Sequence, residues 1–527
     1  MELLTIKEAS KWASNYIKKD VTTSNITYLV NYGRIQKAAE NGTLYVYKQE
    51  LEDYYKKLKE SKISAWTSKL GSDLNWHLSF DQYKESETTK HVHRLHPYKG
   101  KFIPQLVEYF LDSHIDEFKT EVYFSKGDII LDPFCGSGTT LVQANELGIN
   151  AIGVDVSFFN TLISNVKLKN YDFIDIQREI NKISEALNRF LTKSKVVEFD
   201  EILNEQLSAF NSRNFPSGEY RYKINMGLID ENKFSKSQIK KFDKIYQALI
   251  KKYKIKHKQR TRRTFLGRWY IKPVIDEIHV VFEEIKKIKN PDTKKIITVI
   301  LSRTIRSCRA TTHSDLATLL EPVTSIYYCT KHNKICKPLY SIKKMWDRYS
   351  KDTLSRLYHF KKLKTNTTQL CLTDDSRTID LINRLNEKNT DFAKLVKDQK
   401  IAGIFSSPPY VGLIDYHEQH AYAYELFGFE RNDSLEIGPL SNGQGKQARD
   451  SYIESISRVL NNNKKYFKED YNVFLVANDK YNLYPQIAEK AGMKIVNQFK
   501  RPVLNRTEKG KGAYSEIIFH MKENRPC

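Results

Sequence analysis

The sequence predicts an α/β domain that is interrupted by a large insertion and preceded by a small N-terminal head. Three observations predict this architecture. Helical and strand-like patterns alternate around a glycine-rich segment over residues 80–175. The alternation returns in residues 365–527, and a long basic stretch, 176–364, separates the two parts. Strands that alternate with helices are typical of a mostly parallel sheet covered by helices.

Composition limits the class of protein further. The 527 residues include 86 Lys and Arg against 63 Asp and Glu, a net charge of +23, which indicates an anionic polymer as partner. A solvated lysine-rich surface is the alternative. Six cysteines form no disulfide framework, and the sequence has no apolar run of transmembrane length and no signal peptide. We therefore expect a soluble cytoplasmic protein with no membrane partner.

Residues 1–60 form the predicted head. Thr5 and Glu8 fit a capping box that begins one helix, and a second helix should follow Thr22-Thr23-Ser24. An Asn41-Gly42 turn, a short strand and a charged helix come next. This order resembles the winged helix-turn-helix of excisionase and MerR-type DNA binders, although a helical interaction module is an alternative. Residues 61–79 are polar and weakly patterned, which predicts a linker.

The first motif that carries chemistry is Asp-Ile-Ile-Leu-Asp-Pro-Phe-Cys-Gly-Ser-Gly-Thr-Thr at residues 128–140. A buried strand should lead into it, and Gly136 and Gly138 permit a sharp turn and close approach of a ligand. Asp155 follows the next strand, about 20 residues on, where an acid can bind ribose hydroxyls. Leu141 stands where a dinucleotide fingerprint has its third glycine. The loop therefore favours a nucleoside without a pyrophosphate, such as S-adenosylmethionine.

The second motif is Ile-Phe-Ser-Ser-Pro-Pro-Tyr at residues 404–410. An apolar strand ends at a serine, and the two prolines fix the backbone and remove two N–H donors. The Ser407 hydroxyl and the Pro408 carbonyl can each accept a hydrogen from an exocyclic amino group, which orients its nitrogen for attack. Tyr410 offers a face on which an extruded base can stack. A Pro-Pro turn without function is the alternative for this motif alone.

Together the two motifs resemble those of the amino-group DNA methyltransferases, and most closely the N4-cytosine branch. The resemblance covers about residues 80–175 and 365–525. It implies a Rossmann-like methyltransferase domain and S-adenosyl-L-methionine as cofactor. The catalytic residues that it implies are Ser407, Pro408, Pro409 and Tyr410. The cofactor contacts that it implies in the first motif and the next strand are Asp132, Pro133, Phe134, Gly136, Gly138, Thr139 and Asp155.

Three further segments agree with this resemblance. His96–Pro104 is similar to the family segment that closes over the methionine end of the cofactor. The resemblance therefore implies Lys101 and Phe102 as further cofactor contacts. Residues 373–377 are similar to the third motif, in which Asp375 would reach the adenine amino group. Residues 505–516 are similar to the C-terminal motif near the target base. The insertion precedes the third motif here, whereas the usual orders place the recognition region after it.

The insertion contains a run of basic residues between positions 251 and 268, with nine Lys or Arg and no acid. Such a run can neutralise backbone phosphates, so the insertion is predicted to be the target-recognition region; a solvated helix face is the alternative. The predicted DNA-binding residues are Lys251, Lys252, Lys254, Lys256, Lys258, Arg260, Arg262, Arg263 and Arg268.

The cysteines raise two further questions. Cys329, His332 and Cys336, with Cys308 and His313 upstream, have spacing that zinc could use. Cys308-x4-His313 matches no standard knuckle, however, and the intervening lysines would have to point away, so the sequence favours buried thiols and no metal. Cys135 lies in the glycine-rich loop and is not preceded by proline, so it is not expected to be a covalent nucleophile.

The predicted function is transfer of a methyl group from S-adenosyl-L-methionine to N4 of cytosine in double-stranded DNA. The chain would be the modification enzyme of a restriction-modification system, with a possible cognate restriction endonuclease. One alternative is an enzyme for N6 of adenine, or for an amine of RNA or of a protein glutamine. The other is a catalytically silent DNA-binding regulator, against which both intact motifs argue.

Overall fold

The computed structural model describes residues 2–18, 20–31, 33–40, 43–216, 218–256, 263–315, 319–504 and 513–524. Its centre is a seven-stranded sheet in the order β11-β12-β10-β9-β4-β5-β8. The strands are β4 (Ile129–Asp132), β5 (Asn150–Asp155), β8 (Gln369–Thr373), β9 (Ile401–Ser406), β10 (Phe467–Ala477), β11 (Met493–Pro502) and β12 (Ser515–Glu523). The strands from β8 to β10 are parallel, and β12 is antiparallel to both neighbours. The predicted α/β fold is confirmed.

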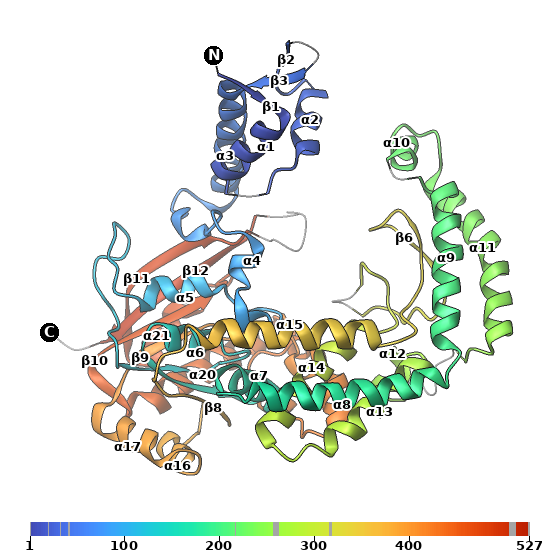
Figure 1. Cartoon of the computed structure of the whole chain (residues 1–527). Helices are drawn as coiled ribbons and strands as arrows, with labels where there is room; N and C mark the ends of the chain where they lie inside the picture. The colour runs from blue at the N-terminus through green and yellow to red at the C-terminus, as the bar shows by residue number, and fades with distance from the viewer. Residues whose placement is uncertain are drawn as a thin grey trace.

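Helices cover both faces of this sheet (Figure 1). Strand β4 is buried throughout, and its alternate side chains enter two different cores, Ile129 and Leu131 in one and Ile130 in the other. Strands buried on both faces read as continuous apolar runs, as the sequence of β4 does. The Ile130 side carries α5 (Pro104–Leu111) and α6 (Thr139–Glu146), and the opposite side carries α16 (Leu381–Asn386), α17 (Thr390–Gln399), α20 (Lys446–Lys464) and α21 (Tyr484–Lys490).

The strand order reverses direction at β4. The chain runs outward from β4 to β5 and β8, and then returns to β9 on the other side of β4. In open α/β sheets, ligands bind at the carboxyl ends of the strands at such a reversal. The fold therefore places a binding crevice beyond the ends of β4 and β9, where the two sequence motifs lie.

The insertion is helical and lies between α7 (Phe158–Leu168) and β8. Its helices are α8 (Phe173–Thr192), α9 (Val196–Asn214), α10 (Glu219–Asn225), α11 (Glu231–Tyr253), α12 (Phe265–Trp269), α13 (Lys272–Lys286), α14 (Pro291–Ser307) and α15 (Lys343–Lys361), with a hairpin of β6 (Tyr327–Cys329) and β7 (Lys334–Cys336). Figure 1 shows α9–α11 rising away from the sheet. The core of the insertion also contains Phe159, Ile163, Tyr422 and Leu426, so the insertion is packed continuously with the α/β domain.

The head comprises β1 (Leu3–Thr5), α1 (Ile6–Tyr16), α2 (Thr23–Asn31), β2 (Lys37–Glu40), β3 (Thr43–Tyr47) and α3 (Lys48–Leu70). The predicted capping box is formed, since Thr5 N donates to Glu8 Oε2 at 2.9 Å and Glu8 N to Thr5 Oγ1 at 3.3 Å. The head has a core of its own. Its assignment as a winged helix-turn-helix stays a prediction, and the Asn41-Gly42 turn lies outside the described residues.

The predicted linker at 61–79 needs correction. Helix α3 continues through Leu70 and ends at Gly71, whose φ is 106°, so only the residues after it connect the head to the sheet. The sequence of this part of the helix is mostly polar, because much of its surface faces solvent, so it lacks the apolar periodicity from which a helix is predicted. Short helical segments complete the connection and the later loops: His77–Ser79, α4 (Glu85–Thr88), His91–Arg94, α18 (Tyr416–Gln419), α19 (Ala421–Phe427), Asp433–Leu435 and Leu440–Asn442. No helix in the described ranges is long and apolar enough to cross a membrane.

Gly403 in β9 provides a test of the sheet packing. A Cβ at this position would lie 1.8 Å from the carbonyl oxygen of Asn472 in β10. Because neither backbone can move without breaking the parallel ladder, we expect Gly403→Ala to lower the free energy of unfolding by about 3 kcal/mol or more. Urea unfolding measures this change. Gly445→Ala is the control, because no atom lies within 4 Å of its Cβ position, and equal stability of the two variants would contradict the packing argument.

Candidate functional site

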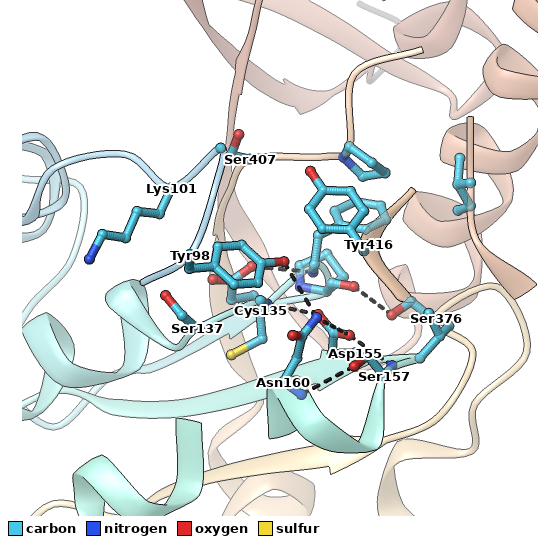
Figure 2. Close-up of a pocket in the computed structure, with 18 of the residues that line it drawn as sticks. Tyr98, Lys101, Cys135, Ser137, Asp155, Ser157, Asn160, Ser376, Ser407 and Tyr416 are labelled. Carbon is cyan, nitrogen blue, oxygen red and sulfur yellow. Dashed lines mark hydrogen bonds between the residues drawn. The ribbon is translucent and has the colours of Figure 1, made fainter. Parts of the chain in front are cut away.

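A pocket lies at the carboxyl ends of β4, β5 and β9 (Figure 2). Most of the residues predicted for the cofactor and for catalysis line it, although they come from segments more than 300 residues apart. These are Lys101, Phe102, Asp132, Pro133, Phe134, Gly136, Thr139, Asp155, Asp375, Ser407 and Pro409. Gly138, Pro408 and Tyr410 are not among the residues that line the pocket.

The glycine-rich loop is held from behind by α7. Gly136 has a φ of 50° and Gly138 a φ of 74°, and a Cβ on Gly138 would lie 2.8 Å from Ser164 Oγ. Ser164 in turn donates to the Gly136 carbonyl at 2.9 Å. Lys167, which is fully buried, donates to the Ser137 carbonyl, and burial holds its pKa well below the usual range. Gly138 therefore provides close packing on α7, and Gly136 forms the surface toward the pocket.

Asp155 at the end of β5 organises the neighbouring backbone. Its Oδ1 accepts from Ser157 N at 2.8 Å and from Asn160 Nδ2 at 3.1 Å, and its Oδ2 accepts from Gly136 N at 2.8 Å. Burial raises the pKa of this carboxyl, and the three donors oppose that effect. Each carboxylate oxygen accepts about two hydrogen bonds, so Oδ2 retains one acceptor position. That position suits a ribose hydroxyl.

Asp132 joins the two motifs at the end of β4. Its Oδ1 accepts from Phe134 N at 3.2 Å and from the hydroxyl of Ser406, the last residue of β9. Burial raises the pKa of Asp132 to about 6, although these hydrogen bonds lower it. The carboxyl thus links the glycine-rich loop to the strand that precedes the Ser-Pro-Pro-Tyr loop.

Asp375 lines the pocket but is already bound. Its Oδ2 lies 2.7 Å from Arg377 Nη2, and its Oδ1 accepts from the Arg377 backbone N at 2.9 Å. Arg377 also donates to the Leu435 carbonyl at 3.2 Å, in a segment that forms another wall of the pocket. The predicted contact of Asp375 with an adenine amino group would have to share the carboxylate with Arg377.

Lys101 differs from its predicted role. Its ammonium group donates to the His93 carbonyl at 2.6 Å, and Figure 2 shows the side chain extending away from the pocket. Burial lowers the pKa of Lys101 to about 8. Lys101 therefore contributes its backbone and apolar stem to the pocket wall and directs its charge elsewhere. Phe102 packs edge-on against Phe405 of β9, with ring centroids 5.6 Å apart.

The Ser-Pro-Pro-Tyr loop continues from β9 to the rim of the pocket. The Tyr410 hydroxyl donates to Glu516 Oε1 at 2.9 Å, and Glu516 Oε2 lies 3.4 Å from Arg501 Nη1. Burial and the Glu516 carboxylate hold the pKa of Tyr410 well above its usual range, so the ring stays a neutral phenol. Glu516 belongs to the predicted C-terminal motif, whose residues 505–512 lie outside the described residues.

Several residues that line the pocket were missed by sequence analysis. Tyr98 lies over the glycine-rich loop and stacks on Tyr416, with ring centroids 5.9 Å apart. Glu436 accepts from the backbone N–H groups of Tyr416 and His417 at 3.2 and 2.8 Å. The other missed residues are Gly100, Cys135, Ser137, Val156, Ser157, Asn160, Ser376, Leu435 and Ile437. Tyr98 lies within the 96–104 segment, which was a usable signal, whereas Tyr416 and Glu436 lie in no recognisable motif.

The basic run lies at one end of α11 and beside α19. The six described basic residues, Lys251, Lys252, Lys254, Lys256, Arg263 and Arg268, are exposed. Arg263 and Arg268 line a groove with Phe265, Trp269 and Arg431. The side chain of Glu425 in α19 accepts from Phe265 N at 2.6 Å, which attaches this part of the run to the α/β domain. Lys258, Arg260 and Arg262 lie outside the described residues.

The cysteines occupy two different environments. Burial raises the pKa of Cys135 well above its usual range, which agrees with its predicted inert role in the loop. Cys308 is 2% exposed and belongs to the hydrophobic core of the insertion. Cys329 and Cys336 instead lie beside His313 and His332.

The fold and the pocket define an S-adenosylmethionine-dependent methyltransferase. The family model described as "DNA methylase" matches residues 8–160. The Type II methyltransferase M.MjaII of Methanocaldococcus jannaschii is 46% identical over 529 residues, which is 99% of this chain and 97% of that protein. The chain therefore belongs to the amino-group DNA methyltransferase family, and S-adenosyl-L-methionine is its cofactor.

Two other relatives match only short parts of the chain. The Type II methyltransferase M.BsoBI of Geobacillus stearothermophilus is 43% identical over 72 residues, 14% of this chain and 13% of its own length. The tRNA (guanine(10)-N2)-dimethyltransferase of M. jannaschii is 28% identical over 81 residues, 15% of this chain and 23% of its own length.

Gly136 offers a direct test of the cofactor pocket. A Cβ at Gly136 would lie 2.9 Å from the Tyr98 ring, at a φ of 50°, so we expect Gly136→Val to displace Tyr98 and to abolish measurable S-adenosylmethionine binding in calorimetry. The matched control is Gly127→Val, where φ is 86° and no atom lies within 4 Å of the Cβ position. Undiminished affinity in folded Gly136→Val would remove this loop from the site.

The raised pKa of Asp132 predicts that the stability difference between wild type and Asp132→Asn depends on pH. Its pKa is about 6 in the folded chain, above about 3.9 in an unfolded chain. Folding therefore takes up a proton between these values, so stability falls as pH rises from about 4 to about 6 and changes little above that. Relative to wild type, Asp132→Asn should gain stability as pH rises from 5 to 7.5, by about 1.4 kcal/mol, because most of the loss in wild type between these values falls between pH 5 and 6. Urea unfolding at several pH values measures the difference.

Asp398→Asn, at an exposed position of α17, is the control for this experiment. Its difference in unfolding free energy from wild type should stay nearly constant over the same pH range. A stability difference between Asp132→Asn and wild type that stays constant over the same pH range would contradict the assignment of a raised pKa to Asp132.

Proposed function

We propose that this DNA methyltransferase transfers a methyl group to N4 of cytosine in double-stranded DNA and is the modification enzyme of a restriction-modification system. One observation carries the proposal: Ser407 and Pro409 of the Ser-Pro-Pro-Tyr loop line the same pocket as Gly136 and Asp155 of the cofactor motif. A base bound at the loop would therefore present its amine to the methyl group of the cofactor.

The chemistry requires positioning more than acid or base groups. When bound, the cofactor would supply an activated methyl group on a sulfonium. The amine nitrogen would form the new N–C bond as the S–C bond breaks, the sulfur would leave as a neutral thioether, and the proton from the nitrogen would pass to solvent. An exocyclic amine is a weak nucleophile, so its lone pair must be aimed at the methyl carbon. The Ser407 hydroxyl and the Pro408 carbonyl would accept the two amine hydrogens. Tyr410 would stack on the base, in an orientation that Glu516 fixes through its hydrogen bond of 2.9 Å.

The choice of cytosine rests on the first residue of this loop. A carboxylate there, as is typical of adenine enzymes, holds the amine with a full charge, whereas Ser407 is neutral and small, which suits a pyrimidine that must reach deeper. N6 of adenine is the alternative. A tRNA enzyme matches 15% of the chain, but the head and the exposed basic run both support DNA as the substrate.

Two features support a role in DNA modification. Relatives of this chain carry the name Type II methyltransferase, which supports a cognate restriction endonuclease as partner. The exposed cations of the basic run lie at the end of α11 and beside α19, where they would contact backbone phosphates. A catalytically silent DNA-binding regulator would need neither the glycine-rich loop nor the Ser-Pro-Pro-Tyr loop.

Nucleoside mass spectrometry of DNA from expressing cells tests the product. We expect N4-methylcytosine with wild type and a loss of about 100-fold in Tyr410→Ala and in Ser407→Ala, because one loses the stacking face and the other an amine acceptor. Tyr358→Ala, which removes an exposed tyrosine of α15, is the control and should leave the yield unchanged. Finding only N6-methyladenine would overturn the assignment of the base.

A further inference from the structure

Two cysteines and two histidines meet in the insertion, away from the cofactor pocket. His313 lies in the loop after α14, Cys329 ends β6, His332 lies in the following turn, and Cys336 ends β7. One ligand atom of each residue lies within 4.8 Å of those of the other three. We propose that these four side chains bind one structural zinc ion.

The distances between the ligand atoms agree with a tetrahedral site. With Zn–S bonds of about 2.3 Å and Zn–N bonds of about 2.05 Å, a sulfur and a nitrogen of a tetrahedral site lie about 3.6 Å apart. Cys329 Sγ lies 3.7 Å from His313 Nδ1, and Cys336 Sγ lies 3.5 Å from His332 Nδ1. Two of the pairs therefore already have the spacing of zinc ligands before any ion is bound.

The chemistry of the four groups selects zinc. Two thiolates and two imidazoles in tetrahedral arrangement are the donor set of structural zinc sites, and four protein ligands leave no position open for a substrate. Cys329 and Cys336 are free thiols that are 1% and 7% exposed. Lys331 and Lys334 are exposed, so the lysines do not fill the space between the ligands, which removes the objection raised by the sequence.

A second group of metal-capable side chains in the described ranges, His91, His93 and Glu146, is a weaker candidate. Lys90 Nζ lies 2.8 Å from the Glu146 carboxylate, so that charge is already neutralised by a cation. In the insertion cluster, by contrast, the ligands are two thiols and two imidazoles, which become favourable zinc ligands once the thiols lose their protons.

A zinc ion would stabilise a hairpin that is otherwise small. Each strand of the β6–β7 hairpin has only three residues, and an isolated two-stranded hairpin is marginally stable. The Asn211 side chain in α9 bonds both the N–H and the carbonyl of Ile335, at 3.1 and 2.9 Å. Zinc would add a link from this anchored hairpin to the loop of His313. It would thereby fix a segment of the proposed target-recognition region.

The Tyr327 hydroxyl lies close to one of the proposed ligand atoms. It is 2.8 Å from His313 Nδ1, and it also accepts a hydrogen bond from the His313 backbone N at 3.2 Å. Binding of zinc through Nδ1 would replace the first of these contacts and leave the second in place. Tyr327→Phe should therefore retain the metal.

The metal content of the full-length protein, purified with reductant and without chelator, tests the proposal. We expect one zinc per chain in wild type and in Cys308→Ser, which removes a buried cysteine outside the cluster, and a loss of zinc in Cys329→Ser and Cys336→Ser. S-adenosylmethionine binding serves as a check of folding in each variant. Zinc retained at wild-type content in both Cys329→Ser and Cys336→Ser would overturn the proposal.

Cobalt(II) uptake by metal-free wild type keeps the test independent of the variants. Tetrahedral coordination by thiolates should give intense visible absorption and a thiolate-to-cobalt charge-transfer band, and added zinc should abolish both. If reduced wild type contains no zinc and takes up neither zinc nor cobalt, or if Cys329 and Cys336 are found as a disulfide in the purified protein, the proposal is wrong.

Discussion

The pairing of β4 with β9 is the interaction on which the site depends. Ile130 pairs with Gly403 and Leu131 with Ile404, which brings together segments that are about 270 residues apart in the sequence. Their carboxyl ends emerge side by side, and the Ser406 hydroxyl bonds Asp132 across the junction. One motif without this pairing is only a glycine-rich turn, and the other is only a Pro-Pro turn. Gly403 is glycine because the backbone of β10 occupies the space for a side chain.

Burying ionisable groups around the pocket costs desolvation free energy. Asp132, Asp155 and Lys167 are each largely removed from water, and burial shifts the pKa of each toward its neutral form. Their hydrogen bonds, several of them to backbone groups of the glycine-rich loop, offset part of this cost. Such groups lower the stability of the free protein but fix the backbone that faces the cofactor. Residues that conflict with stability in this way are typical of functional sites.

The strands and loops of the α/β domain were predictable because their signals are local. The apolar runs that end at Asp132 and Ser406, and the glycines of the loop between residues 132 and 139, are visible in the sequence itself. The parts of the pocket wall formed by Tyr416 and Glu436 could not be predicted, because their position depends on how the loop after β9 folds back across the end of the sheet. Lys101 lines the pocket, but the direction of its ammonium group depends on the His93 carbonyl, a tertiary contact that the sequence does not reveal. The helix through residues 61–70 was hidden by its polar surface.

Sequence spacing alone favoured buried thiols without a metal, whereas the zinc site that we propose rests on where the fold places the cysteines and histidines. The spacing pattern that included Cys308 matched no known arrangement of zinc ligands. Cys308 lies in the core of the insertion and does not belong to the cluster. The hairpin register pairs Cys329 with Lys334 and Cys336 with Tyr327, and only the turn between the strands brings His332 back toward Cys336. His313 comes from a different loop. Ligands that are distributed over two segments can be recognised only when their tertiary positions are known.

The continuous core between the insertion and the α/β domain has a consequence for how DNA binding and catalysis are connected. Tyr422 and Leu426 lie in α19, the helix that also bears Glu425, and are buried with the insertion helices. Glu425 itself accepts hydrogen bonds from the backbone N–H groups at the start of α12. The segment that precedes α19 carries Tyr416, which lines the pocket.

A phosphate contact made by Arg263 or Arg268 is therefore one short helix away from the pocket wall. Because packed interiors transmit displacement rather than absorb it, binding of DNA along α12 would constrain Tyr416 and, through ring stacking, Tyr98. If the insertion binds DNA as proposed, it would hold the DNA on the same packed body that shapes the cofactor pocket.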